Sequence, residues 1–303
     1  MNFSLSMAAA CLAAASFAPI ASAQWGSGSY SSGWSSSQGS CASGSAESDR
    51  RSSSLQVVGL TSDNRLTCFN ENSPGDARVI GFVSNLSQGD TGLVGIDFRV
   101  QDGKLYGVGD KGGIYSIDTS NAVSTRVSQL TVPLTGSSFG VDFNPAADRL
   151  RIVSDTGQNL RHNIAPGGAT TVDGTLNYTA GTPALGVVGS AYTNNDLNAD
   201  TATTLYALDS ALDQIAIQSP PNAGTLAATG KLTVNSTEVA GFDIYSTVRS
   251  GVTIDVQALA SMKTTDGSNA LYSVKLPTGK ATLRGNFGSL FNVIDIAIPL
   301  NQL

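Results

Sequence analysis

The sequence is poor in the side chains that most catalytic and metal sites need. Charged residues make up 13% of the 303 positions, and the chain has three cysteines and a single histidine, His162. One histidine leaves a Ser-His-Asp relay with a single base, and so few His and Cys residues do not make an ordinary catalytic zinc site. The sequence therefore excludes the commonest hydrolase and zinc chemistries.

Basic residues are few and scattered, with Lys+Arg 17 against Asp+Glu 23. No stripe of positive charge suited to a phosphate backbone can be assembled from them. We therefore expect no nucleic acid partner.

Long hydrophobic runs are absent after residue 20, and no later segment approaches the roughly 20 apolar residues that span a bilayer. Residues 1–23 carry no charge, are apolar over residues 7–20 and end in Ala21-Ser22-Ala23. This ending is typical of signal peptidase cleavage, although the usual basic residue at the start is missing. We expect a signal peptide over residues 1–23, no membrane span, and a secreted chain that is extracellular or periplasmic.

Residues 24–54 are dominated by Ser and Gly and show no apolar periodicity, so burial cannot offset the entropy cost of ordering them. We expect a disordered tail there. The tail contains Cys41, and Cys68 lies in an expected strand. An oxidising compartment allows these two cysteines to form a disulfide, and the alternative is a free, buried Cys68.

What the chain does contain is an internal repeat. A tetrapeptide of glycine, an apolar residue, aspartate and a second apolar residue begins at Gly95, Gly140 and Gly241, and a degenerate copy begins at Gly189. Successive glycines lie 45, 49 and 52 residues apart. This is the length of a four-stranded propeller blade.

Each copy is followed by short β-rich runs separated by turn residues, and helical spacing is almost absent. The expected strands after the opening tetrapeptides are residues 94–100, 104–108, 113–118, 125–130, 139–143, 149–154, 159–164, 171–176, 188–193, 204–209, 213–218, 226–232, 251–262, 270–276 and 281–287. The pattern predicts an all-β fold.

The two chain ends supply the halves of a fifth unit. Residues 292–298 match the opening strand of a unit, and residues 55–60, 65–69 and 78–83 resemble the three strands that follow it. We therefore predict a five-bladed β-propeller over residues 55–303, closed by the C-terminal strand pairing into the N-terminal blade. An open β-sandwich or a solenoid is the alternative, and neither needs a split repeat.

Several linked motifs resemble a known family. They are Gly95-Ile96-Asp97-Phe98 with Leu105-Tyr106-Gly107, Gly140 to Pro145 with Asp148 to Ser154 and Asn159-Leu160-Arg161, Ala191 to Asp196 with Thr204-Leu205-Tyr206, and Pro220 to Leu226. Through these motifs, residues 55–303 resemble the domain of unknown function 4394. The resemblance implies an exported, propeller-like repeat domain with no assigned activity, and it offers no catalytic residues to carry over.

The repeated aspartates are the first candidate site: Asp97, Asp142, Asp243 and Asp295, with Ala191 in the fifth place. They fall on the innermost strands, so ring symmetry brings four carboxylates around one axis. They could line the channel and hold a hard cation such as Ca²⁺. Alternatively, each accepts backbone N–H bonds at a blade junction. We favour this structural interpretation, because a residue repeated in each unit usually serves the unit.

A long turn provides a second candidate, in which Asp196, Asn198 and Asp200 alternate as at the start of a calcium loop. The Gly and Glu that such a loop needs further on are Thr201 and Ala207 here. A solvated turn is therefore the simpler interpretation.

The densest basic feature consists of Arg149, Arg151 and Arg161. These side chains could converge on a carboxylate or an acidic sugar. Alternatively, they neutralise the repeated aspartates and the nearby Asp155.

These features predict a non-enzymatic extracellular binding or scaffold module, with a glycan or a protein bound at one mouth of the propeller where loops converge. The alternative is a polysaccharide hydrolase or lyase that uses channel carboxylates in pairs. Solvent access of the repeated aspartates distinguishes the two, because an enzyme of this kind needs them in an open cleft.

Overall fold

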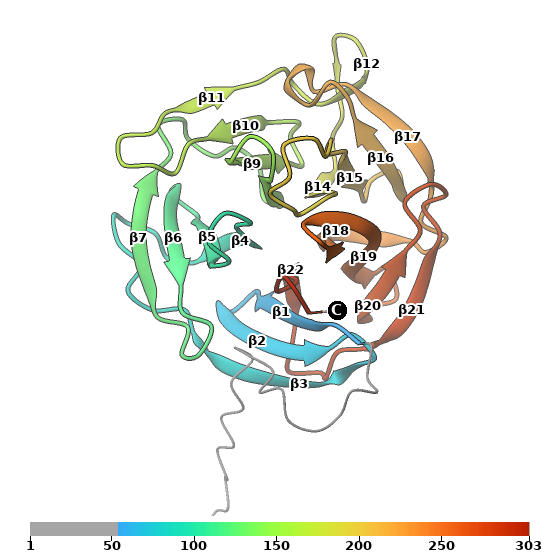
Figure 1. The fold of residues 1–303 in the computed structure, drawn as a ribbon. Helices are drawn as coiled ribbons and strands as arrows, with labels where there is room; N and C mark the ends of the chain where they lie inside the picture. Colours follow the sequence, from blue (N-terminus) through green and yellow to red (C-terminus); the bar gives the residue numbers. More distant parts are fainter. Residues whose placement is uncertain (1–53, 303) are drawn as a thin grey trace, which may run out of the picture. The chain divides into compact units, whose positions relative to one another are not determined.

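The computed structural model describes residues 54–302, which form five four-stranded antiparallel sheets arranged in a ring (Figure 1). The predicted five-bladed β-propeller is confirmed. The signal peptide, the Ser/Gly tail before residue 54 and Cys41 lie outside the described residues and stay predictions. Among the residues described, no helix combines the length and the apolar character needed to cross a membrane.

Each sheet runs from an inner strand at the axis to an outer strand at the rim. The first sheet is β22 (Val293–Ala297), β1 (Gln56–Thr61), β2 (Arg65–Asn70) and β3 (Ser73–Phe82). The second is β4 (Leu93–Phe98), β5 (Leu105–Gly109), β6 (Gly113–Ile117) and β7 (Ser124–Gln129). The third is β8 (Phe139–Asn144), β9 (Arg149–Ser154), β10 (Asn159–His162) and β11 (Thr170–Val172). The fourth is β14 (Val187–Tyr192), β15 (Leu205–Asp209), β16 (Gln214–Gln218) and β17 (Leu226–Lys231). The fifth is β18 (Ser236–Arg249), β19 (Val252–Thr264), β20 (Asn269–Val274) and β21 (Ala281–Asn286).

The two chain ends close the ring. β22 pairs antiparallel with β1, with Val58 opposite Ala297 and Leu60 opposite Asp295. The inner strands then pack in the order β4, β8, β14, β18 and β22, and β22 returns to β4. The split first sheet therefore joins residues from opposite ends of the chain.

The apolar core is divided into five clusters, and each cluster is formed by strands of two neighbouring sheets. The inner strands approach one another so closely that a Cβ atom does not fit at the repeated glycines. A Cβ at Gly140 would lie 2.6 Å from the Ser190 nitrogen, and one at Gly241 would lie 2.4 Å from the Asp295 Cα. This close approach explains why glycine opens each repeat.

Two segments differ from the sequence prediction. The expected strand over residues 171–176 is only the three-residue β11, and a small hairpin of β12 (Asn177–Thr179) and β13 (Thr182–Pro183) follows it. The strand ends because the Asp173 side chain binds two arginines and the Gly174 N–H donates to the Asn222 carbonyl. Between β16 and β17 the chain also forms a short 3-10 helix, η1 (Pro221–Ala223).

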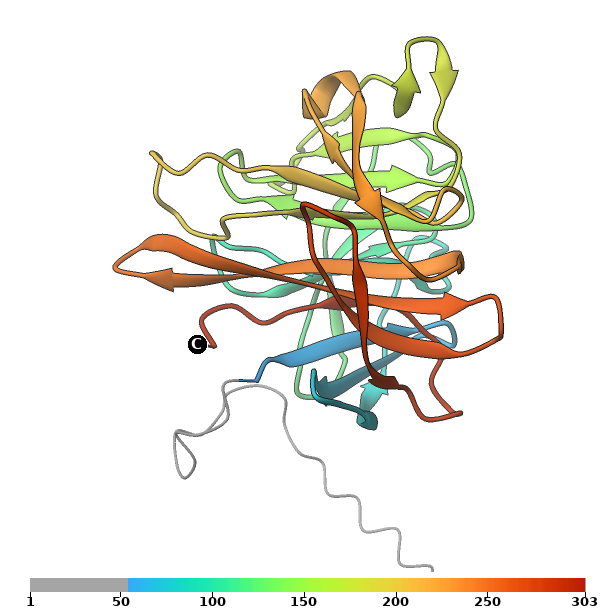
Figure 2. The ribbon, with the colours of Figure 1, turned by 90° about the vertical axis from the view of Figure 1, so that its right-hand side faces the viewer.

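The second difference is the length of β18, which the sequence marked only by the tetrapeptide that begins at Gly241, whereas the long run expected over residues 251–262 is β19. The two strands stay paired as far as Arg249 and Val252, whereas β20 pairs with β19 only from Ala258 onward. Figure 2 shows the β18–β19 hairpin, in orange, projecting past its neighbours on the side of the C-terminus.

Candidate functional site

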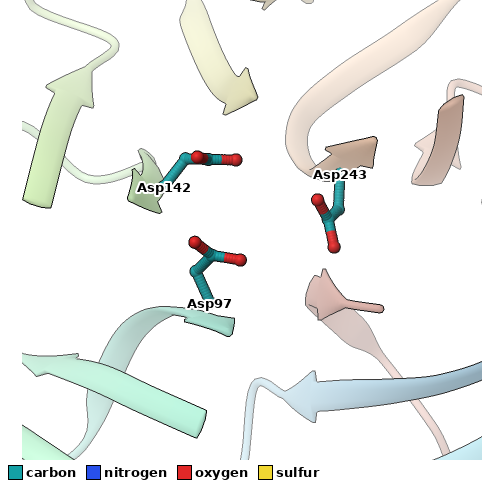
Figure 3. Close-up of side chains that lie close together, drawn as sticks. All are labelled: Asp97, Asp142 and Asp243. Carbon is teal, nitrogen blue, oxygen red and sulfur yellow. The ribbon is translucent and has the colours of Figure 1, made fainter. Parts of the chain in front are cut away.

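The repeated aspartates meet at the centre of the ring. Asp97, Asp142 and Asp243 come from β4, β8 and β18, and they point toward one another (Figure 3). Each offers a carboxylate oxygen such that the three oxygens lie within 4.8 Å of one another. Asp295 on β22 is also buried, and all four side chains belong to residues that are at most 6% exposed.

Hydrogen bonds tie three of these carboxylates to neighbouring blades. Asp97 accepts the Phe143 N–H of β8 at 2.7 Å, and Asp295 accepts the Ile96 N–H of β4 at 2.8 Å. Asp243 accepts the N–H of Ile298, just after β22, at 2.6 Å. Each of the three also accepts the N–H of the residue that follows it. This geometry fits the interpretation of the repeated aspartates as structural links between blades.

Burial raises the pKa values of the four central carboxyl groups. Removal from water raises the pKa of Asp97, Asp142 and Asp295 well above the usual value, and the neighbouring carboxylate charges raise it further. Burial raises the pKa of Asp243 to about 6. Among the residues that the structure describes, no salt bridge reaches any of the four carboxylates. The centre therefore favours protonated carboxyls at mildly acidic pH.

The junction between β14 and β18 lacks the carboxylate, because Ala191 stands in its place. The β14–β15 loop links the two blades instead. The Asn195 side chain donates to the Ile244 carbonyl at 3.1 Å, and its backbone N–H donates to the Ser246 hydroxyl at 3.0 Å. The loop thus binds β18 of the β18–β19 hairpin.

The predicted calcium-type turn is part of this same loop. Asp196 accepts the backbone N–H and the hydroxyl of Thr253 at 2.9 and 2.7 Å, and also the Asn198 N–H. Asn198 in turn accepts the Asp200 N–H. These bonds lower the pKa of Asp196, although burial opposes them. The carboxylate and amide oxygens of this turn therefore hold the loop and the hairpin together.

Arg151 and Arg161 come together, but Arg149 does not join them. Both bind the buried Asp173 at 2.6 Å, and Arg151 is itself only 1% exposed. Arg149 donates to backbone carbonyls of its own turn. The partner of the arginines is thus Asp173, and neither a repeated aspartate nor Asp155, because the chain after β11 folds back over them.

His162 and Cys68 are both buried parts of the fold. His162 is fully buried in β10, with Ser128 and Thr170 hydroxyls at its two ring nitrogens, and burial lowers its pKa. Cys68 is buried in β2 and takes part in a disulfide. Because Cys41 lies outside the described residues, the pairing of Cys41 with Cys68 stays a prediction.

A cavity of about 500 Å³ opens at one mouth of the ring, where the inner strands end. We call it the mouth pocket. Val100 follows β4, Leu197 lies in the β14–β15 loop, Val248 lies next to the last residue of β18, and Leu300 follows β22. These four form its apolar lining. A cavity of about 180 Å³ lies at the opposite ends of the inner strands.

Apart from Asp196, the polar part of the mouth pocket is neutral. Asn195, Asn198, Ser250 and Asn301 contribute amides and a hydroxyl, and the carboxylate of Asp196 is occupied by Thr253 and Asn198. The sequence predicted a site at one mouth and singled out Asp196 and Asn198, but it did not predict the rest of this pocket, because four separate loops form it. One signal was present: Leu197 is an apolar residue within a turn that is otherwise polar, and it is 67% exposed.

Comparisons with known structures find distant likenesses. A glutaminyl cyclase from Myxococcus xanthus shares 14% identity with a TM-score of 0.36, over 68% of this chain and 69% of that protein. An auxiliary nutrient binding protein from Bacteroides thetaiotaomicron shares 13% with a TM-score of 0.42, over 75% of this chain and 56% of that protein. A protein of unknown function from the same bacterium shares 12% with a TM-score of 0.40, over 84% and 69%. The chain thus spans little more than half of the nutrient binding protein, and none of these likenesses assigns an activity.

The sequence comparisons are more specific. No curated protein matches the chain. A family model described as Domain of unknown function (DUF4394) matches residues 65–297, which include all five inner strands. The resemblance found in the linked motifs is therefore confirmed, and the protein belongs to the domain of unknown function 4394 family.

Proposed function

We propose that this protein is an exported, non-enzymatic binding module that holds its ligand at the mouth pocket. The observation that carries the proposal is the pocket itself. Its volume of about 500 Å³ lies within the range of ordinary ligand sites, and aliphatic side chains with a few convergent polar groups line it. Loops from several blades meet there, which is where a rigid scaffold usually carries its binding residues.

The hydrolase alternative receives less support from the geometry. A glycosidase needs two carboxylates roughly 5–9 Å apart in a cleft that admits the substrate. Asp97, Asp142, Asp243 and Asp295 are buried, and the oxygens of Asp97, Asp243 and Asp295 accept backbone N–H groups. Carboxylates bound in this way serve the packing of the blades.

Calcium at the centre is a second candidate, and one observation favours it. Three carboxylate oxygens within 4.8 Å of one another are the kind of ligand that Ca²⁺ prefers. A bound cation would also offset the mutual repulsion of Asp97, Asp142 and Asp243. The turn at Asp196, Asn198 and Asp200 is a weaker proposal, since Thr201 and Ala207 stand where a calcium loop has its Gly and Glu.

A thermal-shift screen of the mature chain tests the proposal. The screen includes neutral oligosaccharides, short peptides, Ca²⁺ and a chelator, and a specific ligand raises the melting temperature by mass action. We expect a peptide or a glycan to raise it in the wild type but not in Leu197→Asp. Release of reducing sugar ends from a polysaccharide panel, lost in Asp97→Asn, would instead establish the hydrolase.

The same screen distinguishes the calcium proposal. If Ca²⁺ binds at the centre, the chelator lowers the melting temperature of the wild type and leaves Asp142→Asn unchanged. Export is tested separately, since N-terminal sequencing of secreted protein should begin at Gln24.

A further inference from the structure

The mouth pocket also has a chemistry that narrows its ligand. Among the described residues that line it, none is a lysine, an arginine, a histidine or an aromatic residue. The lining therefore offers no cation to a phosphate, a carboxylate or an acidic sugar, which arginine and lysine usually bind. The one acid, Asp196, is only 6% exposed and already accepts three hydrogen bonds.

The groups that remain free are neutral. Asn198 uses its side-chain oxygen for the Asp200 N–H, which leaves its amide nitrogen. Hydrogen bonds within residues 54–302 involve neither the Ser250 hydroxyl nor the Asn301 amide, and both residues are exposed at the pocket. An amide side chain both donates and accepts, and this is the pattern that a peptide group complements.

The apolar part of the pocket argues against a hydroxyl-rich ligand. Val100, Val248 and Leu300 cannot hydrogen-bond, so a sugar placed against them would lose hydration from its hydroxyls without replacing it. An aliphatic side chain gains free energy in the same place. Leu197 is 67% exposed at the pocket, and Val248 and Leu300 lie with it in the lining. A bound chain that covers these residues would remove further apolar surface from water.

We propose that the ligand of the mouth pocket is an uncharged protein segment, whose aliphatic side chain enters between Leu197, Val248 and Leu300. Its backbone amides pair with the side chains of Asn198, Ser250 and Asn301. The inference rests on the proposed binding function, and it names a protein rather than a glycan as the partner.

Binding of capped pentapeptides to the mature chain, measured by fluorescence anisotropy, tests the inference. The probes carry Leu, Ile, Lys or Asp at the centre, with Gly, Ser or Asn around it, and a panel of neutral oligosaccharides is measured in parallel. We expect peptides with a central Leu or Ile to bind at least about tenfold more tightly than those with Lys or Asp, a difference of about 1.4 kcal/mol. Leu197→Asp should abolish this binding, because it places a charge at the opening.

Leu290→Asp is the matched control. Leu290 is 75% exposed and lies in the β21–β22 connection, at the other end of the inner strands, so its change should leave binding unaltered. Neutral oligosaccharides that bind and are lost in Leu197→Asp, while peptides do not bind, overturn the inference but leave the binding function. Equal affinity for charged and aliphatic peptides also overturns the inference. If no probe binds, or if binding ignores Leu197→Asp, both the inference and the proposed function fail.

Discussion

The centre of the ring and the mouth pocket lie on the same inner strands but differ in every chemical respect. At the centre, Asp97, Asp142 and Asp243 recur from blade to blade and are buried, and Asp97 and Asp243 accept backbone N–H groups. At the mouth, Leu197 and Asn301 belong to single loops, are exposed and keep side-chain atoms free. The comparison teaches that repetition marks what a blade needs to pack, whereas a departure from the repeat marks where a ligand can be recognised.

The fourth junction makes the same point within the ring. Ala191 removes the carboxylate, and the β14–β15 loop binds the β18–β19 hairpin through Asn195 and Asp196. The blade junction that departs from the repeat is therefore also the one that builds the wall of the mouth pocket.

The largest loss of stability is expected where a buried arginine loses its only carboxylate partner. Asp173→Asn leaves the buried Arg151 guanidinium without a carboxylate, and it should lower the free energy of unfolding by about 3–5 kcal/mol in urea denaturation. Asp102→Asn is the control, because Arg99 is partly exposed and keeps Asp148; a loss below about 1 kcal/mol is expected. Similar losses for both variants would show that Arg151 does not depend on Asp173. This pair of variants measures the cost in stability of breaking a buried ion pair in this fold. The central carboxylates provide the contrast, because they have no salt bridge within the described residues.

The next effect concerns the close approach of inner strands at the centre. Gly241→Ala places a methyl group 2.4 Å from the Asp295 Cα, so the ring junction must shift. We expect a loss of about 1–3 kcal/mol in the free energy of unfolding. Gly92→Ala is the control, since its nearest contact would be the Asn64 side chain at 3.8 Å, and it should stay within about 0.5 kcal/mol of the wild type. A stable Gly241→Ala variant would mean that the inner strands can separate without cost.

The third prediction concerns the pH dependence of folding stability, which the central carboxylates should produce. The pKa of Asp142 is raised in the folded state from its usual 3.8, so the folded protein binds more protons than the unfolded chain above that pH. Stability should therefore fall as the pH rises from about 4 through the raised pKa, with a slope of at most about 1.4 kcal/mol per pH unit for one proton. Asp142→Asn should flatten this slope in denaturation curves recorded with a chelator between pH 4 and 8.

The exposed Asp118 provides the control for this slope. Hydrogen bonds from Ser120 lower the pKa of Asp118, so its contribution is lost only as the pH falls. Asp118→Asn should leave the slope between pH 5 and 8 unchanged. A wild-type slope that persists in full in Asp142→Asn would place the proton uptake on groups other than Asp142.

The smallest effect is expected at the mouth. Leu197→Asp changes a side chain that is 67% exposed, so the free energy of unfolding should stay within about 0.5 kcal/mol of the wild type. Its effect should instead fall on ligand affinity. A clear loss of stability would mean that this loop serves the fold, and the contrast between centre and mouth would fail.

The repeated elements of the fold could be predicted from the sequence, whereas contacts outside the repeat could not. The spacing from Gly95 to Gly241 predicted the blades, and the strand that was expected over residues 149–154 is β9. The partner of Arg151 was not predictable, because Asp173 reaches it only after β11 has ended and the chain has turned back. The extent of β18 was also missed, since residues 236–240 precede the repeat motif and residues 245–249 follow it.

The sequence by itself determined that this chain is a closed ring of five sheets, because the split repeat leaves two half-blades whose strand edges are satisfied only by each other. It also determined that four aspartates lie on inner strands. Only the tertiary structure decided that three of them converge within 4.8 Å and that Asp196 binds the hairpin at Thr253. It alone also decided that Val100, Leu197 and Leu300 share one pocket. Contacts of this kind join loops far apart in the chain, and no local pattern of residues encodes the distance between them.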